Sequence, residues 1–171
     1  NIQTISGTDT EVLLELFSRF GIGCLKMLNG IFSFIIYDNL NKKVFCVRDR
    51  LGVKPLFYTN NNGSYYFCSE IKGFQALKPP EFDPNYLGLN YKSVYDFNKT
   101  KFKDIYQTKP GSVLKIDLET HEKSIFNWYN PLNNLESISP DYNKNKKDFY
   151  NKVYEATKLR LDADLKIGTS L

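Results

Sequence analysis

Arg48-Asp-Arg-Leu-Gly-Val-Lys-Pro-Leu-Phe-Tyr58 decides the fold, because it places a charged turn between two runs of strand-forming residues. The first run is residues 44–47, and the second begins at Leu56. Gly52 can adopt backbone angles that are unfavourable for other residues, and the ring of Pro55 fixes its own φ angle. Both residues therefore favour a fixed turn. We expect the charges of the turn to be structural, because charges at a strand end usually pair with one another or with a neighbouring surface. The alternative is a substrate anchor made of Arg48, Asp49, Arg50 and Lys54.

Strand-forming runs around this turn predict antiparallel hairpins. Residues 31–37 are apolar at nearly every position, which is the pattern of a strand covered on both faces, and residues 38–41 turn the chain back. An Asn-Asn-Asn-Gly turn at 60–63 tolerates left-handed backbone angles, so a second hairpin follows directly and gives four consecutive antiparallel strands. A third hairpin is predicted farther along the chain. The expected strands are residues 31–37, 44–47, 56–58, 64–68, 112–117 and 124–129.

Helix signals occur before, between and after these hairpins. Thr8-x-x-Glu11 is a capping-box pattern, in which the hydroxyl and the carboxylate each bind a free backbone amide, and it predicts a helix over 9–20. Ser69 is predicted to cap a helix over 70–77, which Pro79 and Pro80 end. A further short turn of helix is expected at 24–28 and another at 84–91. Helices and antiparallel strands in separate segments predict the α+β fold class.

Composition excludes several classes of protein. The 171 residues suit one domain or one domain and the start of another, and 42% hydrophobic residues are enough for a packed core. The formal net charge of +4 is spread along the chain, which argues against nucleic-acid binding. Neither a signal peptide nor a membrane span is recognisable. The three cysteines have no paired spacing, so neither a disulfide framework nor a metal site is predicted, and a cytoplasmic location follows.

A change of pattern near residue 130 predicts a domain boundary. Residues 130–143 are rich in Asn, Pro and Ser and read as a linker. A helix of about five turns is then predicted at 145–162, with Phe149, Val153 and Leu161 on its apolar face. The chain supplies no surface to cover this apolar face, so we expect the helix to be marginally stable by itself.

Three segments in order carry a family resemblance. They are Ser6-Gly-Thr-Asp-Thr-Glu-Val12, the 48–58 turn with Tyr66-Phe-Cys-Ser-Glu-Ile-Lys72, and Lys158-Leu-Arg-Leu-Asp-Ala-Asp-Leu-Lys-Ile-Gly-Thr-Ser-Leu171. Together they resemble the glutaminase half of glutamine-hydrolysing asparagine synthetase. The resemblance implies the incomplete C-terminal part of an N-terminal-nucleophile glutaminase domain over 1–130, a sandwich of antiparallel sheets between helices. A linker at 131–143 and the start of an α/β synthetase domain at 144–171 would follow.

The same resemblance implies the chemistry of a parent enzyme. Glutamine is hydrolysed through a cysteinyl thioester, and the released ammonia attacks an aspartyl-AMP intermediate made from aspartate and ATP with Mg²⁺. The nucleophilic cysteine would lie upstream of Asn1 and the ATP-binding loop would begin after Leu171, so no catalytic residue is assigned in this chain. We expect the 171 residues alone to be inactive and to bind no cofactor, while the parent is an ATP-dependent ligase that can form a homodimer.

The candidate site residues are few. Asp9 matches the family position that contacts the α-amino group of glutamine, although an acidic residue in a first helical turn is also favoured by the helix dipole. Leu171 matches a residue next to the nucleotide loop and is a candidate nucleotide contact. Ser69 and Glu70 are read as a helix cap and a first-turn acid, and His121 as a surface residue in a hairpin tip. We expect the cysteines at 24, 46 and 68 to be core residues, since none can act as a terminal nucleophile.

Other functions stay open from the sequence. An Arg-Asp-x-x-Gly-x-x-Pro-Leu turn also resembles amidophosphoribosyltransferase, although the C-terminal segment favours the asparagine synthetase family. A related amidotransferase could act on a sugar or antibiotic precursor. A non-catalytic binding or regulatory module with a glutaminase scaffold is the alternative from a different class.

Overall fold

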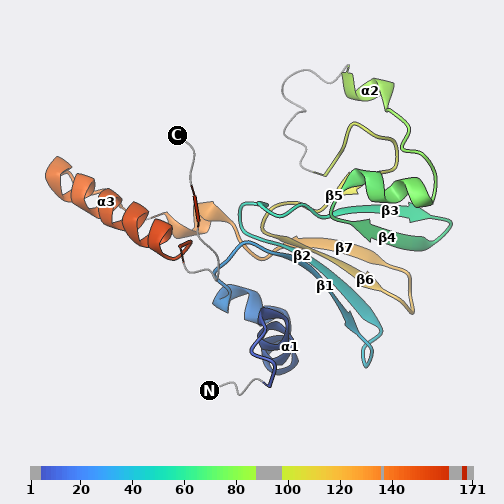
Figure 1. Ribbon diagram of the computed structural model, residues 1–171, viewed down its shortest axis with the longest axis horizontal. Coiled ribbons are helices and arrows are strands. Elements are labelled where there is room, and N and C mark those ends of the chain that lie inside the picture. Colours follow the sequence, from blue (N-terminus) through green and yellow to red (C-terminus); the bar gives the residue numbers. More distant parts are fainter. Residues whose placement is uncertain (1–4, 88–97, 136, 162–166, 169–171) are drawn as a thin grey trace. The chain divides into compact units, whose positions relative to one another are not determined.

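The computed structural model describes residues 5–87, 98–135, 137–161 and 167–168. The chain divides into two compact units, Asn1–Asn130 and Pro131–Leu171. The first unit holds both β-sheets and most of the buried residues, and the second holds a long helix (Figure 1).

Helix α1 (Asp9–Phe20) opens the first unit and has the predicted bounds. The Thr8 hydroxyl accepts a hydrogen bond from the Glu11 backbone N–H, as expected of a helix cap. Gly21 ends the helix with φ of 54°, a backbone angle that favours glycine, and the 3₁₀ helix η1 (Gly21–Met27) follows directly. The short helical turn predicted at 24–28 is therefore confirmed, with an earlier start.

The larger sheet, sheet A, is antiparallel with the strand order β1-β2-β6-β7. Its central pair joins distant parts of the chain, since Lys43 of β2 lies opposite Asp117 of β6. The 31–47 and 112–129 hairpins are confirmed, with small shifts of their ends. The strands are β1 (Ser33–Asp38), β2 (Lys43–Arg48), β6 (Ser112–Asp117) and β7 (Lys123–Asn127).

The smaller sheet, sheet B, has the order β4-β3-β5, with β3 (Phe57–Asn61), β4 (Ser64–Cys68) and β5 (Tyr106–Gln107). The β3–β4 hairpin is confirmed, but it does not continue the first hairpin. Strand β2 pairs with β6 and strand β3 pairs with β5, so the four strands predicted as consecutive lie in two sheets. The two hairpins belong to different sheets because they pair with strands far along the chain, and the local sequence carries no signal of this pairing.

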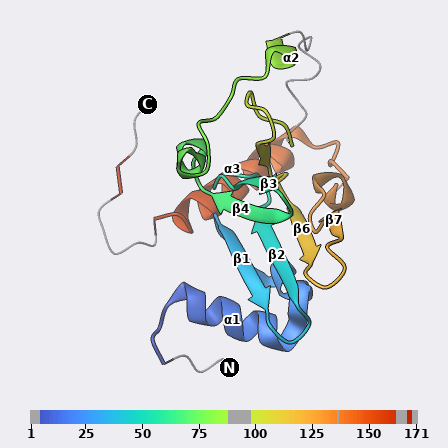
Figure 2. The same ribbon diagram turned by 90° about the vertical axis from the view of Figure 1, so that its right-hand side faces the viewer.

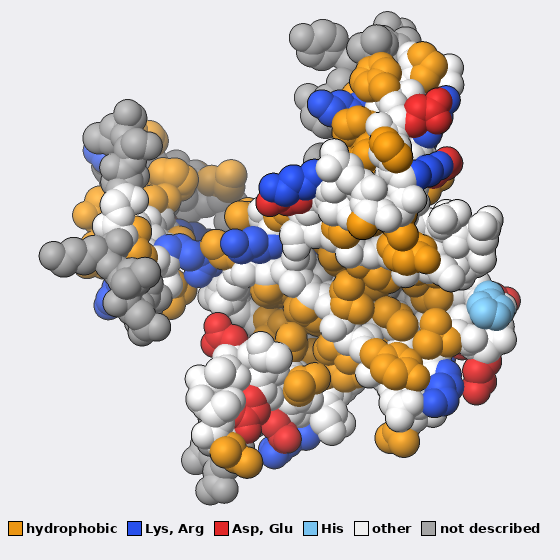
Figure 3. All heavy atoms as spheres, turned by 45° about the vertical axis from the view of Figure 1, so that its right-hand side comes forward, with side chains coloured by type: hydrophobic (Ala, Val, Ile, Leu, Met, Phe, Trp, Pro, Cys, Tyr) orange, Lys and Arg blue, Asp and Glu red, His pale blue; other side chains and the backbone are white. Residues whose placement is uncertain are grey.

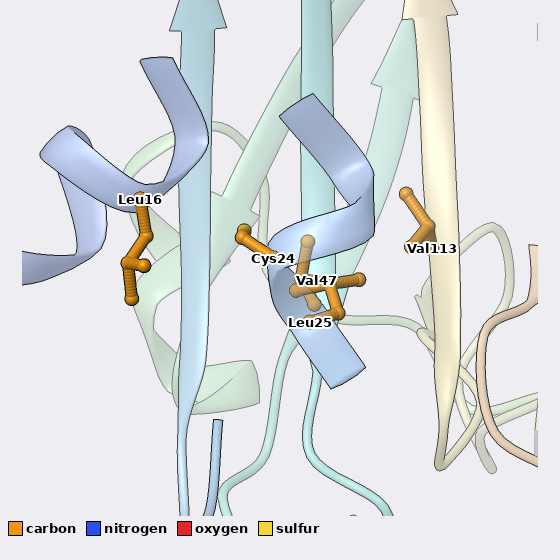
Figure 4. Packing of buried hydrophobic residues seen from close by; sticks show 5 residues of the cluster. All are labelled: Leu16, Cys24, Leu25, Val47 and Val113. Carbon is orange, nitrogen blue, oxygen red and sulfur yellow. The ribbon is translucent and has the colours of Figure 1, made fainter. Parts of the chain in front are cut away.

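Two hydrophobic clusters lie between the layers of the first unit. One lies between sheet A and the helices α1 and η1, and Figure 4 shows its buried residues Leu16, Cys24, Leu25, Val47 and Val113. The other lies between the two sheets and contains Cys46, Leu56, Tyr58, Leu114 and Ile116. Strands β2 and β6 therefore contribute to both clusters, while α1 and η1 cover the outer face of sheet A (Figure 2). The α+β fold with antiparallel sheets is confirmed.

Strand β1 departs from its prediction. Ile36 is buried, but Ile35 and Tyr37 are 43% and 55% exposed, so one face of this strand is open rather than covered. Ile35 lies opposite Cys46, which faces sheet B, yet β1 is an edge strand that sheet B does not cover. Figure 3 shows hydrophobic side chains at the surface over a broad part of the face in view.

Two of the shorter helices also differ from expectation. The helix predicted at 70–77 is the 3₁₀ helix η2 (Ile71–Ala76), whose N-cap residue is Glu70 and has no side-chain capping bond. The prediction that Ser69 caps it is wrong, because the helix begins too late for that hydroxyl to serve its first turn. Helix α2 (Pro84–Leu87) is found where the 84–91 helix was expected, and residues 88–91 lie outside the described residues.

The second unit contains η4 (Pro131–Asn134) and helix α3 (Tyr142–Lys158). Helix α3 starts before the predicted residue 145, because the Asp141 carboxylate accepts hydrogen bonds from the N–H groups of Asn143 and Lys144. The expected linker at 131–143 thus includes a helical turn and the start of α3. No residue of α3 is buried.

Candidate functional site

The loop before α1 is organised by one carboxylate. Glu11 accepts hydrogen bonds from the N–H groups of Ile5 and Ser6, both at 2.7 Å, and from the Ser6 hydroxyl at 2.6 Å. These bonds, led by the one from Ile5, lower the pKa of Glu11. The hydroxyl half of the predicted capping box is confirmed, whereas the carboxylate binds residues earlier in the loop. Glu11 therefore fixes the segment that leads into Asp9.

Asp9 lies in the first turn of α1, at the border of a cavity of about 260 Å³. Among the described residues, its carboxylate has neither a hydrogen bond nor an ion pair with another side chain. The other residues that line the cavity are Val12, Leu13, Leu28, Asn29, Gly30, Ile31, Phe32 and Phe34. A single carboxylate at the edge of a mostly apolar space can bind the ammonium group of a small ligand through a charge-assisted hydrogen bond.

Residues 28–32 form one wall of this cavity and were not assigned to a site from the sequence. Asn29 and Gly30 directly precede the strand that was expected at 31–37. Nothing in local spacing brings them to Asp9, since the packing of α1 and η1 on sheet A does so. A residue pair of Asn and Gly between two apolar elements is too common to have marked a site.

The 48–54 turn is a structural unit at the end of β2. Arg48 is 6% exposed and donates hydrogen bonds to the carbonyl oxygens of Lys54, Thr108 and Gly52, at 2.8, 2.7 and 2.6 Å. Gly52 has φ of 68°, and a Cβ atom there would lie 2.8 Å from Pro110 Cγ and 3.0 Å from the Arg48 guanidinium. Only glycine fits this position without displacing its neighbours.

Asp49 completes the turn. Its Oδ1 accepts from the N–H groups of Leu51 at 3.1 Å and Val53 at 3.0 Å, and its Oδ2 accepts from Lys54 N–H at 3.0 Å. Burial by itself would raise the pKa of Asp49, but these backbone bonds outweigh it and the pKa is lowered. For Arg48 and Asp49, the structural interpretation is therefore confirmed and the substrate anchor is not needed.

The other sequence candidates lie away from the cavity or outside the described residues. Glu70 is the N-cap residue of η2 rather than a first-turn acid, and it forms a surface ion pair with Lys72 at 2.7 Å. His121 is an exposed hairpin residue, as predicted. Leu171 lies outside the described residues, so its nucleotide contact stays a prediction. Within the described ranges, no group of three or more His, Cys, Asp or Glu side chains is arranged to hold a metal ion.

The cysteines behave as packing residues. Cys24 and Cys46 are fully buried, and burial raises the pKa of both thiols, that of Cys46 to about 12. A thiol with a raised pKa carries almost no thiolate near neutral pH, and the thiolate is the nucleophile. Cys68 is half-buried beside Gly73, where a Cβ atom would lie 2.7 Å from its sulfur. The prediction of core cysteines is confirmed for Cys24 and Cys46.

The first unit is therefore an antiparallel α+β domain whose cavity suits a small ligand with a cationic group. Residues 1–129 match the family model described as glutamine amidotransferase domain. The chain belongs to this family.

The chain is also similar in sequence to several glutamine-hydrolysing asparagine synthetases. The chain is 33% identical to a putative asparagine synthetase [glutamine-hydrolyzing] 2 of Methanocaldococcus jannaschii over 100% of this chain and 34% of the relative. It is 48% identical to asparagine synthetase [glutamine-hydrolyzing] 3 of Bacillus subtilis over 63% of this chain and 18% of the relative. Asparagine synthetase [glutamine-hydrolyzing] 2 of Bacillus subtilis is 33% identical over 71% of this chain and 17% of its own length.

These relatives confirm the resemblance to glutamine-hydrolysing asparagine synthetase. The chain spans about a third or less of their length. In the part of the chain that the structure describes, no helix is both long and apolar enough to cross a membrane.

Proposed function

We propose that this chain is part of a glutamine-hydrolysing asparagine synthetase and supplies one wall of its glutamine site. The observation that carries the proposal is the Asp9 carboxylate, presented by α1 at the edge of an apolar cavity within a glutamine amidotransferase domain. Residues 1–130 form the C-terminal part of a glutaminase domain of the N-terminal-nucleophile class, and 131–143 link it to a synthetase domain that begins near 144. The names of the relatives that align along the chain support this assignment.

Asp9 binds the α-ammonium group of glutamine in this proposal. Glu11 is engaged by the loop amides, which leaves Asp9 as the carboxylate available at this end of α1. Asp9 lies at the positive end of the helix dipole, where an acidic side chain is favoured, and a carboxylate there can form a charge-assisted hydrogen bond with the ammonium group. Val12, Leu28 and Phe32 form apolar walls of the cavity beside this contact.

Hydrolysis of the glutamine amide needs a nucleophilic thiolate, which the described cysteines do not provide. Cys24 and Cys46 are buried with raised pKa values, and Cys68 packs against η2. We therefore assign the nucleophile to a cysteine outside this chain. The 171 residues alone are expected to release no ammonia from glutamine.

ATP and Mg²⁺ activate the aspartate carboxyl group in the proposed parent reaction. Leu171, the candidate nucleotide contact, lies outside the described residues. Binding of ATP and Mg²⁺ by the parent enzyme but not by these 171 residues alone, a cytoplasmic location and a homodimer all stay predictions.

Replacing Asp9 tests the proposal in the full-length protein. Asp9→Asn keeps the shape of the side chain but removes its charge, so glutamine-dependent asparagine synthesis should lose about 1.5 to 3 kcal/mol of transition-state stabilisation, roughly 10- to 150-fold in kcat/KM. Synthesis from ammonia should be unchanged, because ammonia bypasses the glutamine site. Glu15→Gln is a matched control on the same helix, since Glu15 forms only a surface pair with Arg19. Unchanged glutamine kinetics in Asp9→Asn would remove Asp9 from the site.

A further inference from the structure

The cavity wall at residues 28–32 is irregular backbone between η1 and β1, and the 48–50 turn holds both of its ends. The Leu28 carbonyl oxygen accepts a hydrogen bond from Arg50 Nη1 at 2.6 Å. The Phe32 carbonyl oxygen accepts one from the Asp49 N–H at 2.9 Å. A segment without a regular hydrogen-bond ladder depends on such bonds for its position.

The Arg50 guanidinium also lies over two aromatic rings. Its Cζ atom is 5.1 Å from the centre of the Trp128 ring and 5.6 Å from that of Tyr129, both within the range of cation–π attraction. Trp128 in turn stacks on Phe32, a cavity residue, with ring centres 6.1 Å apart. Arg50 therefore lies between the cavity wall and an aromatic pair near the end of the first unit.

The aromatic pair has a fixed position of its own. The Trp128 indole N–H donates to the Arg48 carbonyl oxygen at 3.0 Å, and the backbone N–H groups of Trp128 and Tyr129 donate to the Gly111 carbonyl oxygen at 2.9 and 3.1 Å. A residue that contacts this pair and the cavity wall together can hold one relative to the other.

We propose that Arg50 is a positioning residue for the glutamine cavity, which it keeps in shape by fixing the Leu28 carbonyl against the Trp128–Tyr129 pair. This inference rests on the proposed function of the cavity. A guanidinium suits the role because it donates hydrogen bonds in its plane while its face stacks on aromatic rings. A lysine ammonium is a point charge and cannot do both with the same geometry.

The neighbouring Arg48 shows what a purely structural arginine looks like here. Arg48 is nearly fully buried and directs its hydrogen bonds to carbonyl groups of its own turn and of Thr108. Arg50 is half-buried, and its hydrogen bond goes to a residue that lines the cavity. Loss of Arg50 should thus change ligand binding more than it changes the stability of the fold.

Kinetics of the full-length protein separate these effects. Arg50→Met should raise KM for glutamine about tenfold, the effect of losing one charge-assisted hydrogen bond, while kcat stays within about twofold. Arg50→Lys should recover part of the loss, and ammonia-dependent synthesis should be unchanged in both. Arg19→Met is the matched control, because Arg19 pairs with Glu15 on the exposed side of α1. A normal KM for glutamine in Arg50→Met, or an equal fall with both nitrogen donors, would overturn the inference.

Trp128 is the chain's single tryptophan and provides a second readout. Glutamine binding should change the fluorescence of the full-length protein, and the part of this change that Trp128→Phe removes is the Trp128 signal. Arg50→Met should abolish the Trp128 signal, so that saturating glutamine changes the emission of Arg50→Met and of Arg50→Met/Trp128→Phe equally. A full signal in Arg50→Met would contradict the positioning role. If the wild type used no glutamine at all, the proposed function itself would fail, which is a different outcome.

Discussion

Asp49 holds the turn between β2 and β3 through two oxygens that only accept hydrogen bonds. In Asp49→Asn, an NH₂ group replaces one carboxylate oxygen and faces at least one backbone N–H. The hydrogen bond to that N–H is lost, and two hydrogen-bond donors face each other. We expect the free energy of unfolding to fall by about 1.5 to 3 kcal/mol, the range for hydrogen bonds to a charged acceptor. Asp38→Asn is the control, because Asp38 makes similar bonds to Leu40 and Asn41 on the surface and should lose less. Urea unfolding of both variants would measure this, and equal losses would show that burial of Asp49 is unimportant.

The same residue gives the fold a pH dependence of known sign. The pKa of Asp49 is lowered in the folded chain, so its stabilising effect is present above the unfolded pKa of about 3.9 and is lost as pH falls through the folded value. The difference between the wild type and Asp49→Asn should accordingly shrink below about pH 4.

The role of a residue could be predicted from the sequence where that role depends on residues close to it in the sequence. Thr8 was predicted as a cap and is one, and the fixed turn at Gly52 follows from local backbone rules. The contact between Arg50 and Leu28 joins residues 22 positions apart and has no local signal. The same holds for Asn29, which reaches the cavity through packing of the helices on sheet A.

Among the elements, α3 carries the clearest expectation. Helices gain most of their stability from packing, yet no residue of α3 is buried and Phe149 is 72% exposed. In the 171-residue chain, amide hydrogens of α3 should exchange much faster than those of β2, whose neighbours β1 and β6 protect both of its edges. Hydrogen exchange with mass spectrometry would compare them, and equal protection would mean that α3 is stabilised by contacts beyond its own residues.

Element types followed from sequence patterns more reliably than element partners. The 31–47 hairpin and α1 have local signals in turns, caps and spacing, so both were predicted. The pairing of β2 with β6 spans about 70 positions and separates the two hairpins into different sheets. The short β5 has too few residues to produce a pattern, and it was missed.

At the scale of the whole molecule, the chain combines two buried hydrophobic clusters with an open sheet edge. Strands β2 and β6 are covered on both faces, whereas β1 leaves Ile35 and Tyr37 exposed. The antiparallel α+β class could be predicted from patterns of turns, caps and spacing, and the family from three short motifs. The shape of the cavity could not, since it depends on how α1, η1 and β1 pack together.

Isotope transfer tests the proposed function most directly. The full-length protein would be given aspartate, ATP, Mg²⁺ and glutamine labelled with ¹⁵N in its side-chain amide, and the products would be identified by mass spectrometry. The account predicts asparagine that carries the label in its side-chain amide, together with unlabelled glutamate. Release of labelled ammonia without asparagine, or transfer of the label to another acceptor, would contradict it.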